Sequence, residues 1–196
     1  MSPTIGLVMT EKEKMLNGQD YWALDSELMR DHHKAKTLCQ EYNQTSINNP
    51  QGKARILKEL FHADYDAYIE PNFFCDYGYN IKLGTNFYAN HNLIILDGAP
   101  VTIGDNALLG PNVGIYTTGH PIDVTRRNAG IQSSQAITIG NNVWIGGGVN
   151  ICPGVTIGDN CVIGAGALVI HDIPANSIAV GNPCRVIKSI DKTSPE

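Results

Sequence analysis

The chain has 196 residues, and its 14 Lys and Arg against 19 Asp and Glu give a formal net charge of −5 at pH 7. This length suits one domain of moderate size, and the acidic balance argues against nucleic acid or an anionic membrane surface as a partner. The sequence has no run of about 18 apolar residues, so we expect no transmembrane helix.

The N-terminal segment, residues 1–9, has neither a basic n-region nor a clear cleavage site, so we expect no signal peptide. Five cysteines are scattered along the chain without paired spacing: Cys39, Cys75, Cys152, Cys161 and Cys184. Such spacing is typical of free thiols in a reducing compartment and predicts a cytoplasmic protein.

Residues 10–61 are predicted to be helical. The run Thr10-Glu-Lys-Glu13 has the pattern of a capping box, and Gly18 is expected to end the helix that it begins. A second helix is predicted to begin near Asp25 and Ser26, and a third to follow the break at Asn49-Pro50. The second helix has an apolar face at helical spacing, on which His32 also lies: Leu28, Ala35, Cys39 and Tyr42.

From about residue 69 to 181 the sequence repeats with a period of six. The clearest repeats begin at Ile103, Leu109, Ile115, Ile139, Ile145, Ile151, Ile157 and Ile163. Most open with an aliphatic residue followed by glycine, and their fifth residue is small or β-branched. This period predicts a parallel β-helix with both of these side chains inside, and with glycine at corners where φ is positive. A solenoid needs ends that hide its last strands, so we expect residues 1–66 to form a helical cap.

Two segments interrupt the repeat. Its phase slips by two residues around Asp97-Gly-Ala-Pro100, which predicts an irregular turn. The polar segment at about 121–135 lacks the repeat and is predicted to be an extruded loop, a kind of segment that is often functional. We therefore divide the chain into the cap at 1–66, a β-helix at 67–190 and a tail at 191–196.

Several motifs in this order resemble the maltose and galactoside O-acetyltransferases: Asp76-Tyr-Gly-Tyr-Asn-Ile, Tyr88-Ala-Asn90, Thr118-Gly-His-Pro121 and Ala179-Val-Gly-Asn-Pro-Cys-Arg-Val-Ile. The resemblance covers nearly the whole chain. It implies a mainly β fold, a left-handed parallel β-helix of hexapeptide repeats with an N-terminal α-helical cap. It also implies an acyltransferase that uses acetyl-CoA, with no metal, and a homotrimer whose active sites lie between subunits.

His120 is the expected catalytic residue. Transfer of an acetyl group to a hydroxyl needs a base, and a neutral imidazole suits that role near pH 7. The resemblance assigns this role to the histidine of Thr118-Gly-His-Pro121. It also places Asn90 near the reacting centre, where an amide orients the acceptor or helps to stabilise the oxyanion.

The resemblance implies further site residues. Asp25, Asp76, Tyr88 and Asp97 are expected in the acceptor site, and Trp144, Gly147, Ala165, Arg185 and Lys188 along the coenzyme A groove. Two positions depart from the family. His32 stands where an arginine is usual, and Ile170-His171 stands where Thr-Lys is usual. These departures leave the identity of the acceptor open.

The leading hypothesis is an acetyl-CoA-dependent O-acetyltransferase acting on a sugar hydroxyl. An antibiotic or other xenobiotic hydroxyl is a second hypothesis, because related enzymes use the same histidine. A zinc lyase on this scaffold needs three imidazoles, and Ile115 and Thr125 stand where its second histidine would be. A non-catalytic trimeric binding scaffold is the remaining alternative.

Overall fold

The computed structural model describes residues 9–190. Two segments lie outside the described residues. They are the expected tail at 191–196 and residues 1–8, where no signal peptide was expected. None of the helices in residues 9–190 has the length and apolar character that crossing a membrane requires.

The N-terminal cap contains the predicted helices, α1 (Glu11–Leu16), α2 (Ser26–Gln44) and α3 (Pro50–Phe61). The capping box at α1 is confirmed, because the Thr10 hydroxyl accepts a bond from the Glu13 amide at 3.1 Å and the Glu13 carboxylate accepts one from the Thr10 amide at 2.7 Å. The prediction missed β1 (Tyr21–Trp22), a short strand between α1 and α2. It pairs antiparallel with β11 (Ile131–Ser134).

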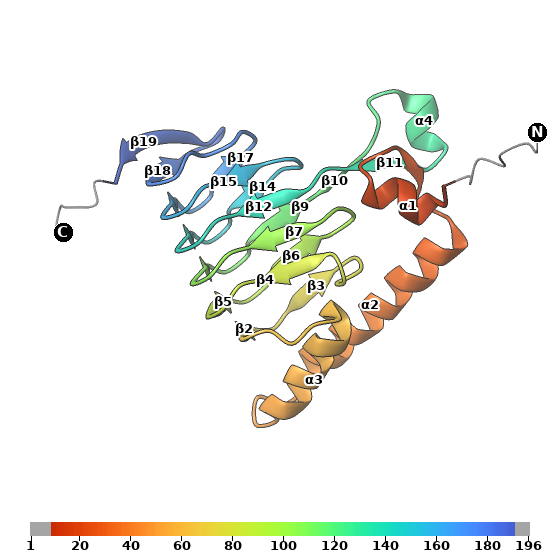
Figure 1. Cartoon of the computed structure of the whole chain (residues 1–196), viewed down its shortest axis with the longest axis horizontal. Helices are drawn as coiled ribbons and strands as arrows, with labels where there is room; N and C mark the ends of the chain where they lie inside the picture. Colours follow the sequence, from red (N-terminus) through yellow and green to blue (C-terminus); the bar gives the residue numbers. More distant parts are fainter. Residues whose placement is uncertain (1–8, 191–196) are drawn as a thin grey trace, which may run out of the picture.

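The apolar face predicted for α2 is confirmed, since Leu28, Ala35, Cys39 and Tyr42 are all buried. The Tyr42 hydroxyl donates to the Ile69 carbonyl at 2.5 Å, and its ring meets that of Phe73 edge-on. Helices α2 and α3 therefore cover the end of the solenoid where the first coil begins (Figure 1).

The solenoid has three faces, each a sheet of parallel strands, and each coil adds one strand to each face in turn. The first face holds β2 (Ala67–Ile69), β5 (Phe87–Ala89), β8 (Leu108–Leu109), β13 (Trp144–Ile145), β16 (Val162–Ile163) and β18 (Ser177–Val180). The second holds β3 (Phe73–Cys75), β6 (Leu93–Leu96), β9 (Gly114–Tyr116), β14 (Asn150–Ile151) and β17 (Leu168–Val169). The third holds β4 (Ile81–Leu83), β7 (Val101–Ile103), β12 (Ile137–Ile139) and β15 (Thr156–Ile157).

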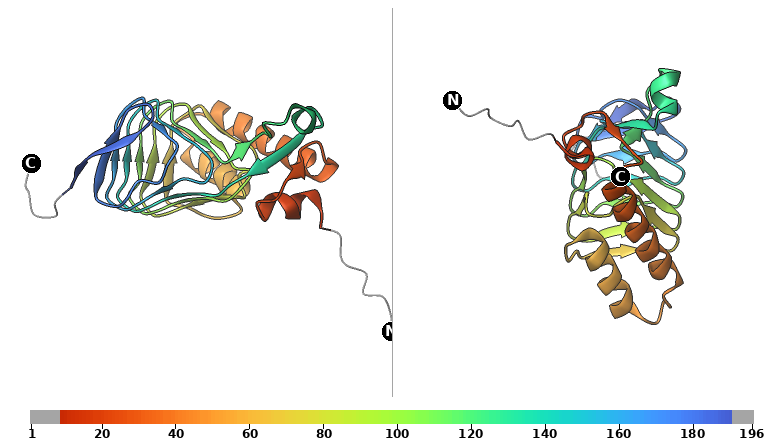
Figure 2. Two further views of the ribbon diagram at one scale, coloured as in Figure 1. Left: turned by 90° about the horizontal axis from the view of Figure 1, so that it is seen from above. Right: turned by 90° about the vertical axis from the view of Figure 1, so that its right-hand side faces the viewer.

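Two additions complete the solenoid. Strand β19 (Arg185–Ser189) folds back antiparallel on β18 at the far end (Figure 2). Between β9 and β12 the chain leaves the solenoid through β10 (Thr118–Gly119), α4 (Val124–Asn128) and β11. The segment predicted as an extruded loop therefore carries a short helix and a strand.

Inward residues stack in register from coil to coil. On the second face, Cys75, Ile95, Ile115, Ile151 and Val169 lie above one another, and all are buried. The inward position predicted for Cys161 is likewise buried. This aliphatic column is the continuous core that a six-residue period predicts, and the prediction of a hexapeptide-repeat β-helix is confirmed.

Positive φ, the reason predicted for the repeat's glycines, is found at Gly148, Gly154 and Gly166, whereas the glycines in the second position of a repeat are needed for another reason. Gly146 does not have a positive φ; instead, a β-carbon there would lie 2.6 Å from the Ala165 amide nitrogen of the next coil. Glycine is needed because the coils approach closely. The left-handed corners are taken largely by asparagines, which tolerate positive φ and bond to one another along the solenoid, as Asn106 donates to Asn142 at 3.0 Å.

Candidate active site

His120 is exposed and follows β10, at the point where the chain leaves the solenoid. It lines a cavity of about 510 Å³ between the second helix and the first coils. Leu28 and Met29 of α2 provide an apolar part of the wall, and His32 and Asp76 provide a polar part. A cavity of this size and mixed lining fits a small polar molecule.

A buried network of hydroxyl groups holds the strand that carries His120. The Thr118 and Ser134 hydroxyls lie 3.0 Å apart, and the Tyr21 hydroxyl lies 3.2 Å from that of Ser134. Tyr21 also donates to the Gln132 side chain at 2.9 Å. The cap strand β1 and the β10–β11 hairpin are thus joined by side chains as well as by backbone pairing, so His120 rests on a fixed support.

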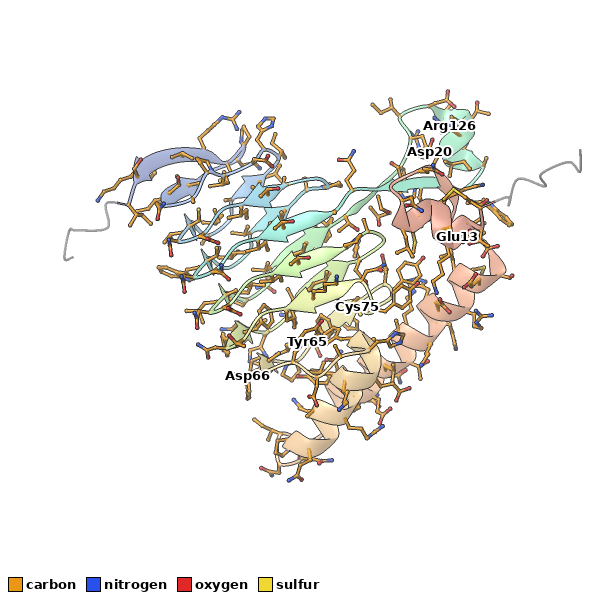
Figure 3. The ribbon with its side chains drawn as sticks, viewed as in Figure 1. Glu13, Asp20, Tyr65, Asp66, Cys75 and Arg126 are labelled. Carbon is orange, nitrogen blue, oxygen red and sulfur yellow. The ribbon has the colours of Figure 1, made fainter. Side chains whose placement is uncertain are left out.

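The extruded segment is tied down at its tip. Arg126 of α4 forms an ion pair with Asp20, which precedes β1, and Figure 3 shows the two side chains together. Arg127 donates to the carbonyls of Pro121 and Ile122 at 2.9 and 3.0 Å. These contacts fix the course of the chain directly after His120.

His32 and Asp76 form the polar wall of the cavity. His32 Nε2 lies 3.1 Å from Asp76 Oδ1, and the His32 ring lies 5.9 Å from that of Tyr77. Both side chains are partly exposed. The pair therefore offers hydrogen-bonding atoms to a ligand that enters beside His120.

The structure corrects the expectation that Asp97 lines the acceptor site. Asp97 is fully buried, and its carboxylate accepts bonds from the backbone amides of Asp76, Tyr77 and Gly78 at 3.0, 2.9 and 2.7 Å. Burial raises the pKa of Asp97 to about 6 although these amides favour the charged form. The irregular turn predicted here exists, and Asp97 uses it to position Asp76.

Asp25 also differs from its expected role. It is the N-cap of α2, where one carboxylate oxygen accepts from the Glu27 and Leu28 amides at 2.9 and 3.3 Å. A capping carboxylate is held by the helix end, and Asp25 is not part of the cavity wall, although its neighbour Leu24 is. Of the predicted acceptor residues, Asp76 is the one that shares the cavity with His120.

The other predicted residues lie on the first face of the solenoid. Tyr88, Leu108 and Trp144 follow one another in register across β5, β8 and β13. The same row continues through β16 and β18 to Lys188 of β19. Trp144 is 58% exposed, so this row presents an open apolar surface with cations at its far end.

The corner that follows this face holds Asn90, Gly147 and Ala165. Asn90 Oδ1 accepts from the His91 amide at 2.7 Å, so Nδ2 is the end of the amide that is left to donate. Ala165 lies one coil beyond Gly147, and Arg185 begins β19. The predicted coenzyme residues thus share a face and its edge, together with Tyr88 and Asn90.

The predicted site residues accordingly form two groups. One group, His120 and Asp76, lines the cavity beside the cap, whereas Asn90 and the coenzyme residues lie on the first face and its corner. Among the residues that the structure describes, Asn90 is not part of the wall of the cavity that His120 lines. Tyr77 and Gln132 also line the cavity; no spacing rule marks either of them, because long-range folding alone brings them to His120.

Comparison with known proteins places these features in context. The family model of the maltose acetyltransferase hexapeptide capping motif matches residues 14–63. The model of six bacterial transferase hexapeptide repeats matches residues 136–171, and that of the succinyl-transferase hexapeptide repeat matches residues 100–124.

Comparisons over nearly the whole chain also identify acetyltransferases. A candidate acetyltransferase of Saccharomyces cerevisiae is 53% identical over 180 residues, which cover 91% of this chain and 92% of that protein. The structure of a maltose O-acetyltransferase from Clostridium difficile 630 has 52% identity and a TM-score of 0.92, covering 94% of this chain and 99% of that chain. The structure of a galactoside acetyltransferase in complex with coenzyme A has 44% identity and a TM-score of 0.87, covering 94% and 92%.

Proposed function

This chain belongs to the maltose and galactoside O-acetyltransferase family and is an acyltransferase, and we propose that it transfers an acetyl group from acetyl-CoA to a hydroxyl of a sugar. The observation that carries this proposal is the shared cavity of His120, His32 and Asp76. In this cavity the exposed imidazole of His120 lies beside a wall of hydrogen-bonding side chains.

His120 acts as the general base. Its neutral imidazole takes the proton of the sugar hydroxyl as the oxygen attacks the thioester carbonyl carbon. Collapse of the tetrahedral intermediate breaks the carbon–sulfur bond, and the proton passes from the imidazolium to the departing coenzyme A thiolate. The hydrogen bonds of Thr118 and Tyr21 keep the imidazole in place. A base that is already positioned beside the hydroxyl lowers the entropic part of the activation barrier, and this raises the rate of transfer.

Asn90 provides a hydrogen-bond donor for the reacting centre. Its Oδ1 is occupied by the His91 amide, which leaves Nδ2 for the oxyanion or for the acceptor. The coenzyme lies along the first face, with Trp144, Gly147 and Ala165 beside the pantetheine arm and the cations Arg185 and Lys188 near phosphates. Coenzyme A in the related galactoside acetyltransferase structure supports acetyl-CoA as the donor.

The active site is completed by a second copy of the chain in a homotrimer. His120 and Asn90 lie in separate groups within one chain, and the exposed row of Tyr88, Leu108 and Trp144 is an apolar surface that a neighbouring subunit would cover. If the cavity of one subunit faces the first face of the next, the base, the amide and the coenzyme meet at one place.

A sugar is favoured over a xenobiotic as the acceptor. Sugar hydroxyls are bound by carboxylates and imidazoles, and the cavity presents Asp76 and His32 in contact. The cap that brings His32 to Asp76 is the part of the chain that matches the maltose acetyltransferase capping motif.

The test is release of the coenzyme A thiol from acetyl-CoA with maltose, galactosides and hydroxylated antibiotics as acceptors. His120→Ala is expected to lower kcat by about 10²- to 10⁴-fold, the usual contribution of a general base. His33→Ala is the matched control, because His33 is the exposed neighbour of His32 on α2 and does not line the cavity. Turnover of His120→Ala within about threefold of wild type would refute the base assignment, and transfer to antibiotics alone would refute the sugar acceptor.

A further inference from the structure

A row of four rings leads away from the cavity of His120. The ring centres of His32 and Tyr77 are 5.9 Å apart, those of Tyr77 and Tyr79 are 5.6 Å apart, and those of Tyr79 and His62 are 5.8 Å apart. The row begins on α2, crosses the turn held by Asp97 and ends at the residue that caps α3.

The far end of this row lines a second cavity of about 180 Å³ under the cap. Tyr77 belongs to the walls of both cavities, so the two adjoin each other there. Tyr79 and His62 provide aromatic surface in the second cavity, and Asp31, Lys12 and Lys34 provide charged groups. At about 30 Å³ per water, this volume holds a small cluster of waters or much of one pyranose ring.

The walls of the second cavity are held in place before any ligand enters. Lys12 Nζ lies 4.6 Å from the centre of the Tyr79 ring and 2.6 Å from Asp31. The Tyr79 hydroxyl donates to the same carboxylate at 3.4 Å. A rigid aromatic ring binds a ligand at a low entropic cost, because little freedom is left to lose.

We propose that the second cavity is a subsite for a further sugar residue of an oligosaccharide acceptor, whose reacting residue lies beside His120. This proposal rests on the proposed sugar acetylation. A pyranose has apolar C–H faces and polar edges, so Tyr77, Tyr79 and His62 meet its faces while Asp31 and Lys34 meet its hydroxyls. The subsite makes the enzyme prefer disaccharides and longer acceptors over monosaccharides.

The experiment compares kcat/KM for methyl glucoside, maltose and maltotriose with acetyl-CoA as the donor. The wild type is expected to prefer maltose or maltotriose to the monosaccharide by about twofold to twelvefold, the range that one aromatic contact of about 0.5–1.5 kcal/mol gives. Tyr79→Leu removes this preference by lowering kcat/KM for the longer acceptors. His62→Asn also weakens it, and asparagine retains the left-handed conformation of position 62, where φ is 54°.

Two controls separate the subsite from general damage. Tyr79→Phe keeps the ring and is expected to keep the preference, whereas Phe74→Leu changes an exposed aromatic residue that lines neither cavity. Equal use of mono- and disaccharides by the wild type, or equal loss for both in Tyr79→Leu, would overturn the subsite and leave the proposed function standing. Failure to acetylate any sugar would overturn both.

Discussion

His32 Nε2 lies 3.1 Å from Asp76 Oδ1, which joins the second helix of the cap to the turn between β3 and β4 in the first coil. The resemblance described above implies an arginine at the position that His32 occupies in this chain. A histidine is shorter than an arginine and binds a carboxylate through one nitrogen at a time. The pair therefore bears on which acceptor is bound rather than on the transfer step.

His32→Ala is expected to raise the KM for the sugar acceptor by about threefold to tenfold, since the lost bond involves a charged group that is partly screened by solvent. The kcat and the KM for acetyl-CoA should change little, because His32 is absent from the coenzyme face. Steady-state kinetics with each substrate varied in turn would measure this, with His33→Ala as the control. A fall in kcat with an unchanged acceptor KM would contradict the assignment.

Asp97 is expected to make the free energy of unfolding of the protein depend on pH. Its folded pKa of about 6 lies above the ordinary value of 3.8, so the folded state binds the proton more tightly than the unfolded state does. The free energy of unfolding therefore falls as pH rises from about 4 to 6, by about 1.4 kcal/mol per unit of pKa difference, or at most about 3 kcal/mol. Above pH 6 this contribution is constant.

Asp97→Asn should remove this dependence. Urea unfolding of both proteins between pH 4 and 7.5 would show the free-energy difference between wild type and variant shrinking as pH rises to 6. Carboxyl groups far from Asp97 titrate in both proteins alike, so the difference isolates Asp97 together with its neighbour Asp76. A difference that grows over this range would show that the folded pKa lies below 3.8.

Most of the fold follows from local sequence. The six-residue period, the capping box at Thr10 and the break at Asn49-Pro50 each specify structure through neighbouring residues, and the structure has each feature. Strand β1 was missed because two residues are too few to show a periodic pattern. Tyr21 takes part in a strand only because it pairs with Gln132, which lies more than a hundred positions away in the sequence.

The site was harder to predict for the same reason. Asp97 and Asp76 are both acidic residues beside turns, and sequence alone does not tell which one is buried. Folding settles it, because three backbone amides converge on Asp97 and leave Asp76 at the surface of the cavity. Similarly, an Ile-Gly pair indicates a corner but not whether the corner needs a positive φ or space for the next coil.

The Tyr21 hydroxyl should couple the cap to the position of His120. Tyr21→Phe removes the bond to Gln132 and the contact with Ser134, at a cost of about 1–2 kcal/mol in the free energy of unfolding. A lower kcat is expected as well, because Thr118 in the same network precedes His120 by two residues. Urea denaturation and thiol-release assays on one preparation would test both effects. Unchanged kcat despite lower stability would show that the network supports the fold only.

Close approach of the coils makes Gly146 intolerant of any side chain. Gly146→Ala places a β-carbon 2.6 Å from the Ala165 amide nitrogen, so the backbone must shift, and we expect a loss of about 1–3 kcal/mol. Gly119→Ala is the matched control, because nothing lies within 4 Å of its added β-carbon, and its unfolding free energy should stay within about 0.5 kcal/mol of wild type. Equal unfolding midpoints for the two variants would refute the close-approach argument.

The separation of His120 from Asn90 yields a test of where the active site is assembled. His120→Ala and Asn90→Ala should each be nearly inactive as pure proteins. If a site takes its base from one subunit and its amide from the next, mixed trimers contain some sites in which both residues are intact. Random assembly from equal amounts of the two chains makes this about one site in four.

Co-expression of differently tagged variants, followed by purification through both tags, would isolate the mixed trimers. Each mixed trimer purified in this way has one intact site in three, so restored activity near a third of wild type per site would support an active site shared between subunits. Mixing the purified variants without subunit exchange is the control and should restore nothing. If the mixed trimers stayed as inactive as their parents, His120 and Asn90 would have to act within one subunit, and Asn90 would lose its proposed role at the cavity.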